Sequence, residues 1–266
     1  MKFIFTQTHK ILFLILLIFF TDCSESKKEI TLKIMSYNVR HGVSMNWEPA
    51  MEMQAEIISD QNPQWIGLQE IDNKCKRSGF VDQPKKYSEL TNTTGYFGSF
   101  MDFDSGQYGM AVLSGLKVVD TEILKLPAGA EPRVSIIQTI EIAKDINIVL
   151  ANVHFDWTEP GLRTSQAETL LKRLIDIGLP TIVLGDYNAE PESPTINLFE
   201  KYGFKAIEKS ENNFTWEANN PTVEIDHVYY RSTEKVQIIP VSIEVLNEPE
   251  ASDHRPVVAE IKLIKK

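Results

Sequence analysis

The most constraining feature of this sequence is a repeated pattern in which a short apolar segment ends in a polar residue that can bind metal or transfer a proton. These polar residues are Asn38, Glu70, His154, Asp186 with Asn188, Asp226, and Asp253 with His254. Binding and catalytic sites are concave places where a few polar groups converge. Because several strands each end in one such group, we expect these strand ends to lie together along one edge of the domain and to form one polar site.

Length and composition fit one soluble domain and restrict its partners. A chain of 266 residues is within reach of a single large sandwich or barrel. Its contents of 42% hydrophobic and 24% charged residues are ordinary for a globular protein. The formal net charge is −10, whereas proteins that hold nucleic acid non-specifically neutralise several phosphates with Lys and Arg. Tight, sequence-independent binding of nucleic acid is therefore disfavoured.

The amino terminus has the form of an export signal. Lys2 and Lys10 precede a wholly apolar run at 11–20, which is too short to span about 30 Å of hydrocarbon at roughly 1.5 Å per residue. Cys23 follows, as in a bacterial lipoprotein signal whose cysteine is lipidated. Because Asp22 stands where such signals carry a small residue, a plain cleaved signal or a short anchor is the alternative. The expected organisation is a signal peptide at 1–23, a polar tether at 24–30 and a catalytic domain at 31–266.

This organisation predicts the location of the protein. We expect an exported monomer in the bacterial periplasm or cell envelope, anchored to the outer membrane if Cys23 is lipidated. Cys75 is the one cysteine left in the domain and has no partner there for an intramolecular disulfide. It is expected to be a buried or half-buried thiol without a catalytic role.

The body of the chain alternates many short β-type runs with few helical patterns. Strands are expected at 32–37, 65–69, 109–113, 117–126, 134–142, 146–153, 181–184, 225–230, 236–245 and 256–263, and helices at 47–60, 162–177 and 194–202. No repeat or linker interrupts this body. The pattern predicts sheets covered by helices on their outer faces.

Six short motifs resemble the endonuclease/exonuclease/phosphatase superfamily. They are Ser36-Tyr37-Asn38-Val39-Arg40, Leu68-Gln69-Glu70, Ala151-Asn152-Val153-His154, Gly185-Asp186-Tyr187-Asn188, Ile225-Asp226-His227 and Ser252-Asp253-His254-Arg255-Pro256. Each motif is weak alone, but all six occur in the order of the family. The resemblance implies an α+β fold: a four-layer α/β/β/α sandwich of two mostly antiparallel, mixed sheets flanked by helices.

The expected metal ligands are Glu70, Asn38 and Asp253. A carboxylate at the end of an apolar strand is costly to bury unpaired, although Glu70 alone also fits a solvated strand end. Carboxylate and amide oxygens suit Mg²⁺, or alternatively Mn²⁺, better than Zn²⁺. The resemblance makes Glu70 the principal ligand, supported by Asn38 and Asp253.

The expected catalytic residues are Asp186, Asn188, His154, Asp226 and His254. Asp186 and Asn188 lie two positions apart, so in extended geometry both face one phosphate, where Asp186 deprotonates water and Asn188 donates to the oxyanion. A turn with self-bonded side chains is the alternative for this pair. The resemblance implies that His254 contacts the phosphate and is oriented by Asp226, with His154 on the opposite side. His227 is expected to face away from the site.

The expected substrate-binding residues are Arg77, Arg133 and Tyr108. A guanidinium matches phosphate geometry, although a solvated surface arginine is the alternative at both positions. Trp157, Phe214 and Trp216 are candidates for a sugar or headgroup pocket, with packing as the alternative.

The predicted function is metal-dependent hydrolysis of a phosphate ester, by a phosphodiesterase acting on a small, lipid-linked or glycan-linked substrate outside the cytoplasm. A secreted or surface nuclease is the second hypothesis. A non-catalytic surface binding lipoprotein is the third, but it predicts gaps in the acid–histidine–metal set, and the sequence has none.

Overall fold

The computed structural model describes residues 29–144, 146–209 and 212–266. The predicted signal peptide, Cys23 and most of the predicted tether lie outside these residues. The last two residues of the tether, Glu29 and Ile30, belong to the first strand, so the domain begins slightly earlier than predicted. Among the described helices, none is long and apolar enough to cross a membrane.

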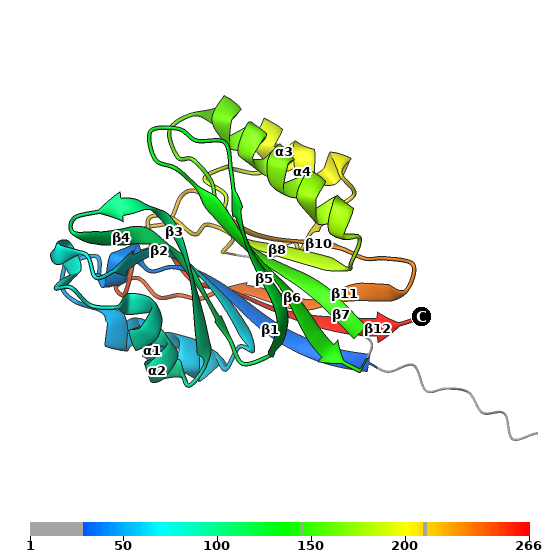
Figure 1. Ribbon diagram of the computed structural model, residues 1–266, viewed down its shortest axis with the longest axis horizontal. Helices are drawn as coiled ribbons and strands as arrows, with labels where there is room; N and C mark the ends of the chain where they lie inside the picture. The colour runs from blue at the N-terminus through cyan, green and yellow to red at the C-terminus, as the bar shows by residue number, and fades with distance from the viewer. Residues whose placement is uncertain (1–28, 145, 210–211) are drawn as a thin grey trace, which may run out of the picture.

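Two six-stranded mixed sheets form the centre of the domain (Figure 1). One sheet has the strand order β11-β12-β1-β2-β4-β3 and the other β5-β6-β7-β8-β10-β9. The pairs β1–β2 and β7–β8 are parallel, and the other pairs are antiparallel. The strands are β1 (Glu29–Asn38), β2 (Trp65–Asn73), β3 (Thr94–Phe103), β4 (Gly106–Ser114), β5 (Lys117–Lys125), β6 (Val134–Ala143), β7 (Ile146–His154), β8 (Thr181–Asp186), β9 (Lys205–Ala206), β10 (Asp226–Arg231), β11 (Val236–Val245) and β12 (Val257–Lys265).

Helices cover the outer face of each sheet, as the long apolar strands require. The helices are α1 (Met51–Gln61), α2 (Gln83–Thr91), α3 (Pro160–Ile177) and α4 (Pro194–Lys201). Three apolar clusters separate the layers: one between the sheets, one under α3 and α4, and one under α1 and α2. The predicted four-layer α/β/β/α sandwich is therefore confirmed.

Most predicted elements are present, with differences at the ends and three omissions. The first helix begins at Met51 and not at Trp47, whose φ of 63° lies in the left-handed region. The helix α2, the strand β3 and the two-residue strand β9 were not predicted from the sequence.

The pairing of three neighbouring strands explains how distant residues meet. His154 ends β7 and lies opposite Asp186 at the end of β8, which in turn lies opposite Asp226 at the start of β10. Gly185 permits this arrangement, because a Cβ atom there would lie 2.1 Å from the carbonyl oxygen of Val153. The register thus places one imidazole and two carboxylates in a row across the sheet.

Glu70 reaches the same end of the molecule through a β-bulge. The prediction that the strand ends at Glu70 is wrong, because β2 continues to Asn73. Its pairing with β4 shifts between Leu68 and Ile71, and Glu70 has a φ of 57°. A bulge turns a side chain out of the regular alternation of a strand, and here it presents Glu70 to the site.

Asn152 links the two sheets beneath the site. Its amide nitrogen donates to the carbonyl oxygens of Leu68 and Ala111, both at 3.0 Å, and its oxygen accepts from Gln69 Nε2 at 2.6 Å. All of these groups are buried, so the loss of one partner leaves a polar atom without a hydrogen bond that water could replace.

We therefore expect Asn152→Ala to lower the free energy of unfolding by about 3 kcal/mol, measured by urea denaturation. Asn147→Ala, on the half-buried part of the same strand, is the matched control and should change stability by less than about 0.5 kcal/mol. Equal effects of the two substitutions would contradict the structural role of Asn152.

Candidate active site

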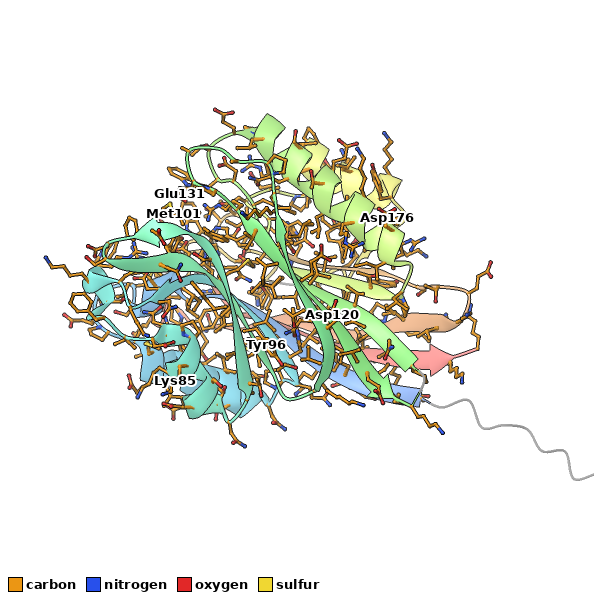
Figure 2. All side chains as sticks on the ribbon, viewed as in Figure 1. Lys85, Tyr96, Met101, Asp120, Glu131 and Asp176 are labelled. Atoms are coloured by element: carbon orange, nitrogen blue, oxygen red, sulfur yellow. The ribbon has the colours of Figure 1, made fainter. Side chains whose placement is uncertain are left out.

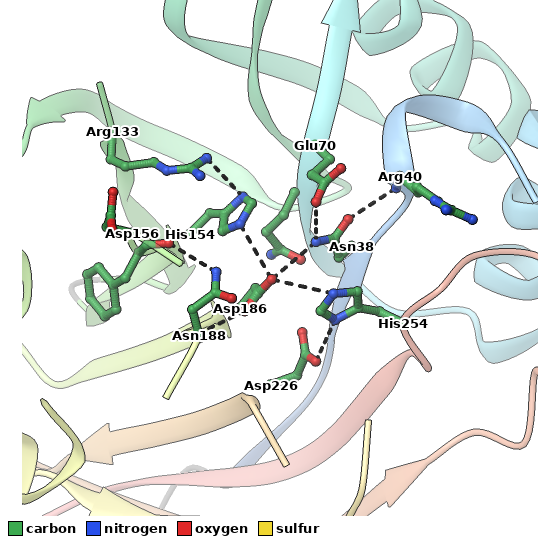
Figure 3. Close-up of polar contacts among 12 residues, drawn as sticks. Asn38, Arg40, Glu70, Arg133, His154, Asp156, Asp186, Asn188, Asp226 and His254 are labelled. Carbon is green, nitrogen blue, oxygen red and sulfur yellow. Dashed lines mark hydrogen bonds and ion pairs between the residues drawn. The ribbon is translucent and has the colours of Figure 1, made fainter. Parts of the chain in front are cut away.

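A cavity of about 780 Å³ opens where the strands deliver their polar residues. Its lining includes nine of the eleven predicted site residues: Glu70, Arg77, Tyr108, Arg133, His154, Asp186, Asn188, Asp253 and His254. The other two, Asn38 and Asp226, lie directly behind this lining and are hydrogen-bonded to it (Figure 3). Met101 and Glu131 belong to the same rim and are labelled in Figure 2.

Asp186 is at the centre of the polar contacts (Figure 3). One carboxylate oxygen accepts from the backbone nitrogen of Asn188 at 2.9 Å, and Asn188 has a φ of 48°, so the predicted extended geometry of this pair is wrong and the alternative turn is present. The other accepts from Asn38 Nδ2 at 3.1 Å and lies 3.5 Å from His154 Nε2 and 3.6 Å from His254 Nε2. Burial raises the pKa of Asp186 to about 7, against the opposing positive charge of His254. A carboxylate with a pKa near neutrality is suited to accept a proton from water.

His254 is held as a cation between two carboxylates. Its Nδ1 donates to Asp226 Oδ2 at 2.9 Å, while its Nε2 faces Asp186. Burial alone would lower the pKa of His254, but the charges of Asp226 and Asp186 outweigh burial and raise the pKa to about 10. At neutral pH the ring therefore carries a positive charge next to the cavity.

His154 differs from His254 in charge, although both are buried. Burial and the neighbouring Arg133 lower the pKa of His154 well below its usual value. Its Nδ1 lies 3.4 Å from Arg133 Nη1, which can only donate, so the ring proton is on Nε2 and points toward Asp186. His154 is thus a neutral hydrogen-bond donor opposite a cationic His254.

Glu70 and Asp253 are two carboxylates that face the cavity, with Asn38 as a link behind them. The amide nitrogen of Asn38 donates to Glu70 Oε1 at 3.0 Å and to Asp186, and its oxygen accepts from the backbone of Arg40. Burial raises the pKa of Asp253, and the negative charge of Glu70 raises it further. A bound cation would relieve this repulsion, and the oxygen donors suit a hard divalent metal, so the residues fit a metal site.

A second set of possible metal donors consists of Asp186, Asp226 and His254, whose ligand atoms lie within 4.8 Å of one another. The hydrogen bond between His254 and Asp226 already satisfies one nitrogen and one oxygen of this set. All three residues are also almost fully buried, whereas Glu70 and Asp253 are partly open to the cavity. The second set is therefore better described as a hydrogen-bonded chain.

The three predicted substrate-binding residues lie together on one wall. Arg133 is 2% exposed, which rules out a solvated surface arginine, and it contacts Glu131 at 2.8 Å. Arg77 makes two hydrogen bonds of 2.8 Å to Asp72 and lies over the rings of Phe103 and Tyr108. Its guanidinium is therefore neutralised by Asp72, while Tyr108 forms the buried floor beneath it.

Two predictions about nearby residues are confirmed. His227 faces the opposite side of β10, where it is buried against Tyr187 and Tyr229 and contacts the carbonyl oxygen of Ala189. Cys75 is a buried thiol that forms no disulfide with a described residue, and its sulfur lies near the carbonyl oxygens of Phe103 and Gln107.

Three residues at the site were not predicted from the sequence. Arg40 Nε lies 3.4 Å from Asp253, and His41 Nδ1 lies 3.8 Å from Glu70, so the segment after β1 brings a guanidinium and an imidazole to the predicted metal ligands. Arg163, in the first turn of α3, lines the cavity close enough to Asp186 to sense its charge. Their only sequence signal was proximity to the motifs: Arg40 stands in one, and Arg163 follows His154 by nine residues.

The fold and this constellation define a class of enzyme. A model of the Endonuclease/Exonuclease/phosphatase family matches residues 35–254, most of the chain, so the protein belongs to that family. The family comprises phosphoester hydrolases, which agrees with a buried acid–histidine chain facing two cavity carboxylates. No curated protein matches the sequence.

Solved structures of other proteins share the fold. An endonuclease/exonuclease/phosphatase family protein of Bacteroides thetaiotaomicron is 18% identical, with 89% of this chain and 96% of that chain covered and a TM-score of 0.72. The mannosyl-6-phosphatase of the same organism is 18% identical, with coverage of 86% and 99% and a TM-score of 0.69. The catalytic domain of human Nocturnin, solved with a bound sulfate anion, is 20% identical, with coverage of 89% and 97% and a TM-score of 0.67.

Proposed function

We propose that this protein is a divalent-metal-dependent phosphodiesterase that acts on a small, lipid-linked or glycan-linked phosphate ester outside the cytoplasm. The observation that carries the proposal is the contact of Asp186 with both a cationic His254 and a neutral His154, in a cavity shared with Glu70. This arrangement supplies a base, a positive charge and a neutral donor around one point.

Each side chain then has a distinct role in hydrolysis. Asp186 orients a water molecule and takes its proton, because its pKa lies near neutrality. The His254 imidazolium, held by Asp226, stabilises the charge that develops on the phosphate oxygens. His154 lies on the side of Asp186 opposite His254 and donates a hydrogen bond from Nε2 to the phosphate or to the leaving group.

Asn188 completes the wall beside Asp186. Its amide nitrogen donates to the carbonyl oxygen of Phe155 at 3.1 Å, and the residue lines the cavity. Of the predicted ligands, Glu70 and Asp253 would hold the metal, with Mg²⁺ expected and Mn²⁺ as the alternative. Asn38 would instead position Glu70, because its amide nitrogen donates to Glu70 and its oxygen already accepts from the backbone of Arg40. When bound there, the metal would neutralise phosphate oxygens and the leaving oxygen.

Glu70→Gln tests the ligand assignment. Loss of the charge should raise the magnesium concentration that gives half-maximal activity by at least about tenfold, and reduce the rise in melting temperature on magnesium addition. Glu244→Gln, which alters an exposed carboxylate on β11 outside the cavity lining, is the control and should leave the magnesium midpoint unchanged. An unchanged midpoint in Glu70→Gln would remove Glu70 from the metal site.

A substrate panel tests the function itself. Purified domain is assayed with a bis-aryl phosphate, an aryl monophosphate, sphingomyelin and plasmid DNA, each with magnesium or with chelator. We expect magnesium-dependent turnover of the diester and little cleavage of DNA, since the chain is acidic. Preferred cleavage of DNA would favour the nuclease hypothesis. Export and anchoring through Cys23 stay a prediction, which fractionation of cells expressing the full chain tests.

A further inference from the structure

Trp157 is a large apolar side chain left open on the wall of a polar cavity. It is 63% exposed, lines the cavity and follows the catalytic His154 by three residues. Its ring stacks on no aromatic or cationic side chain of the described residues. Packing therefore does not account for its position.

The exposed ring is held in place by a rigid turn. The buried carboxylate of Asp156 accepts from the backbone nitrogens of Thr158 and Glu159, each at 2.8 Å, and from the Thr158 hydroxyl at 2.7 Å. The backbone nitrogen of Asp156 donates to Gln166 Oε1 at 2.8 Å. Because the turn is fixed on both sides of Trp157, the ring is presented to the cavity and not merely carried by a loose loop.

The cavity that Trp157 lines also carries polar groups of mixed character. Arg163 donates to the carbonyl oxygen of Asp156 at 2.9 Å and forms no ion pair with a described carboxylate. The cavity lining continues to Glu190 and Ser193, on the segment that follows Asp186. The bond from Asn188 to Phe155 ties the two segments into one wall.

We propose that this wall binds a neutral polyhydroxylated ring, as in a hexose, esterified to the phosphate that the enzyme hydrolyses. The C–H face of such a ring packs on an indole, and its hydroxyl groups pair with a carboxylate, a hydroxyl and a guanidinium, which Glu190, Ser193 and Arg163 supply. The negative charge of Glu190, and of the chain as a whole, opposes a polyanion at the same place. The proposal rests on the proposed phosphate-ester hydrolysis and names its substrate class.

The test compares Trp157→Ala with a matched control, Phe80→Ala, which removes an aromatic side chain that is 58% exposed and does not line the cavity. The substrates are hexose 6-phosphate and glycerol 3-phosphate, each also as its methyl diester, so that ester chemistry is constant and only the ring differs. Trp157→Ala should raise KM for the hexose esters by about tenfold and change the glycerol esters by less than about twofold. Phe80→Ala should change neither.

A second measurement does not require turnover. Saturation-transfer NMR with a phosphate-free methyl hexopyranoside should show contact with the wild type and with Phe80→Ala, and none with Trp157→Ala. If Trp157→Ala hydrolyses both ester types and keeps the wild-type preference for hexose esters, the ring site is overturned and the hydrolytic function stands. If the hexopyranoside contacts the protein but no ester is hydrolysed, the ring site stands and the proposed hydrolytic function is wrong. A Trp157-dependent preference for nucleotides over hexose esters would also overturn the proposal.

Discussion

Asp186→Ala is expected to slow phosphate-ester hydrolysis by about 10²–10⁴-fold while the protein remains folded. Asp186 is the one carboxylate in contact with both site histidines among the described residues, and its pKa of about 7 suits it to accept a proton from water. The measurement is kcat on a phosphodiester under saturating magnesium, with the melting temperature as a check on folding.

Asp120→Ala provides the matched control for that experiment. Asp120 is an exposed carboxylate on β5, away from the cavity lining, and its removal should leave kcat unchanged. Normal turnover in Asp186→Ala would exclude Asp186 as the base.

Asp226→Asn should shift the alkaline limit of activity to lower pH. In the wild type, the charge of Asp226 helps to keep His254 protonated until the pH approaches about 10. Without that charge the pKa of His254 falls. The ring then loses its proton as the pH rises through this lower pKa, and the enzyme loses its activity in the same pH range. The profile of kcat/KM from about pH 6 to about pH 10 measures this shift.

His254→Ala sets the scale for the loss, which is expected to be about 10²–10³-fold. Asp226→Asn should retain most of the wild-type activity at the acid end of the pH profile. At the alkaline end its activity should fall toward that of His254→Ala. His227→Gln, which alters the neighbouring residue on the other face of β10, should keep the wild-type alkaline limit. An unchanged limit in Asp226→Asn would mean that Asp226 does not control the charge of His254.

The convergence of the site was predictable because it depends on strand ends. His154, Asp186 and Asp226 each stand at the boundary of an apolar run, and parallel or antiparallel pairing then places them side by side. The order of the six motifs added the resemblance to a family, which implied the four-layer fold and the pairing of His254 with Asp226.

The features that were not predicted depend on backbone geometry that no residue pattern marks. The bulge at Glu70 requires a left-handed conformation in the middle of a strand. Arg40 and His41 also have positive φ angles, of 46° and 43°, and it is this turn that brings them to Asp253 and Glu70. The conformations follow from contacts between elements that are distant in sequence.

Two of the three missed elements, β3 and α2, have weak local signals. The strand β3 contains Gly95 and Gly98, which lower strand propensity but are needed where β3 passes close to Pro84 and Ile136. The helix α2 is short and mostly polar, and its start is marked by Pro84 in the first turn and by Asp82, whose side chain accepts from the backbone of Lys85.

The most direct test of the central claim is the fate of water oxygen during hydrolysis. A simple phosphodiester is incubated with the purified domain and magnesium in ¹⁸O-labelled water, and the products are analysed by ³¹P NMR and mass spectrometry. Attack of an Asp186-activated water on phosphorus predicts one ¹⁸O atom in the phosphate product and none in the released alcohol. Recovery of ¹⁸O in the alcohol would contradict the account. So would incorporation of ¹⁸O into the phosphate product by Asp186→Ala at the wild-type rate.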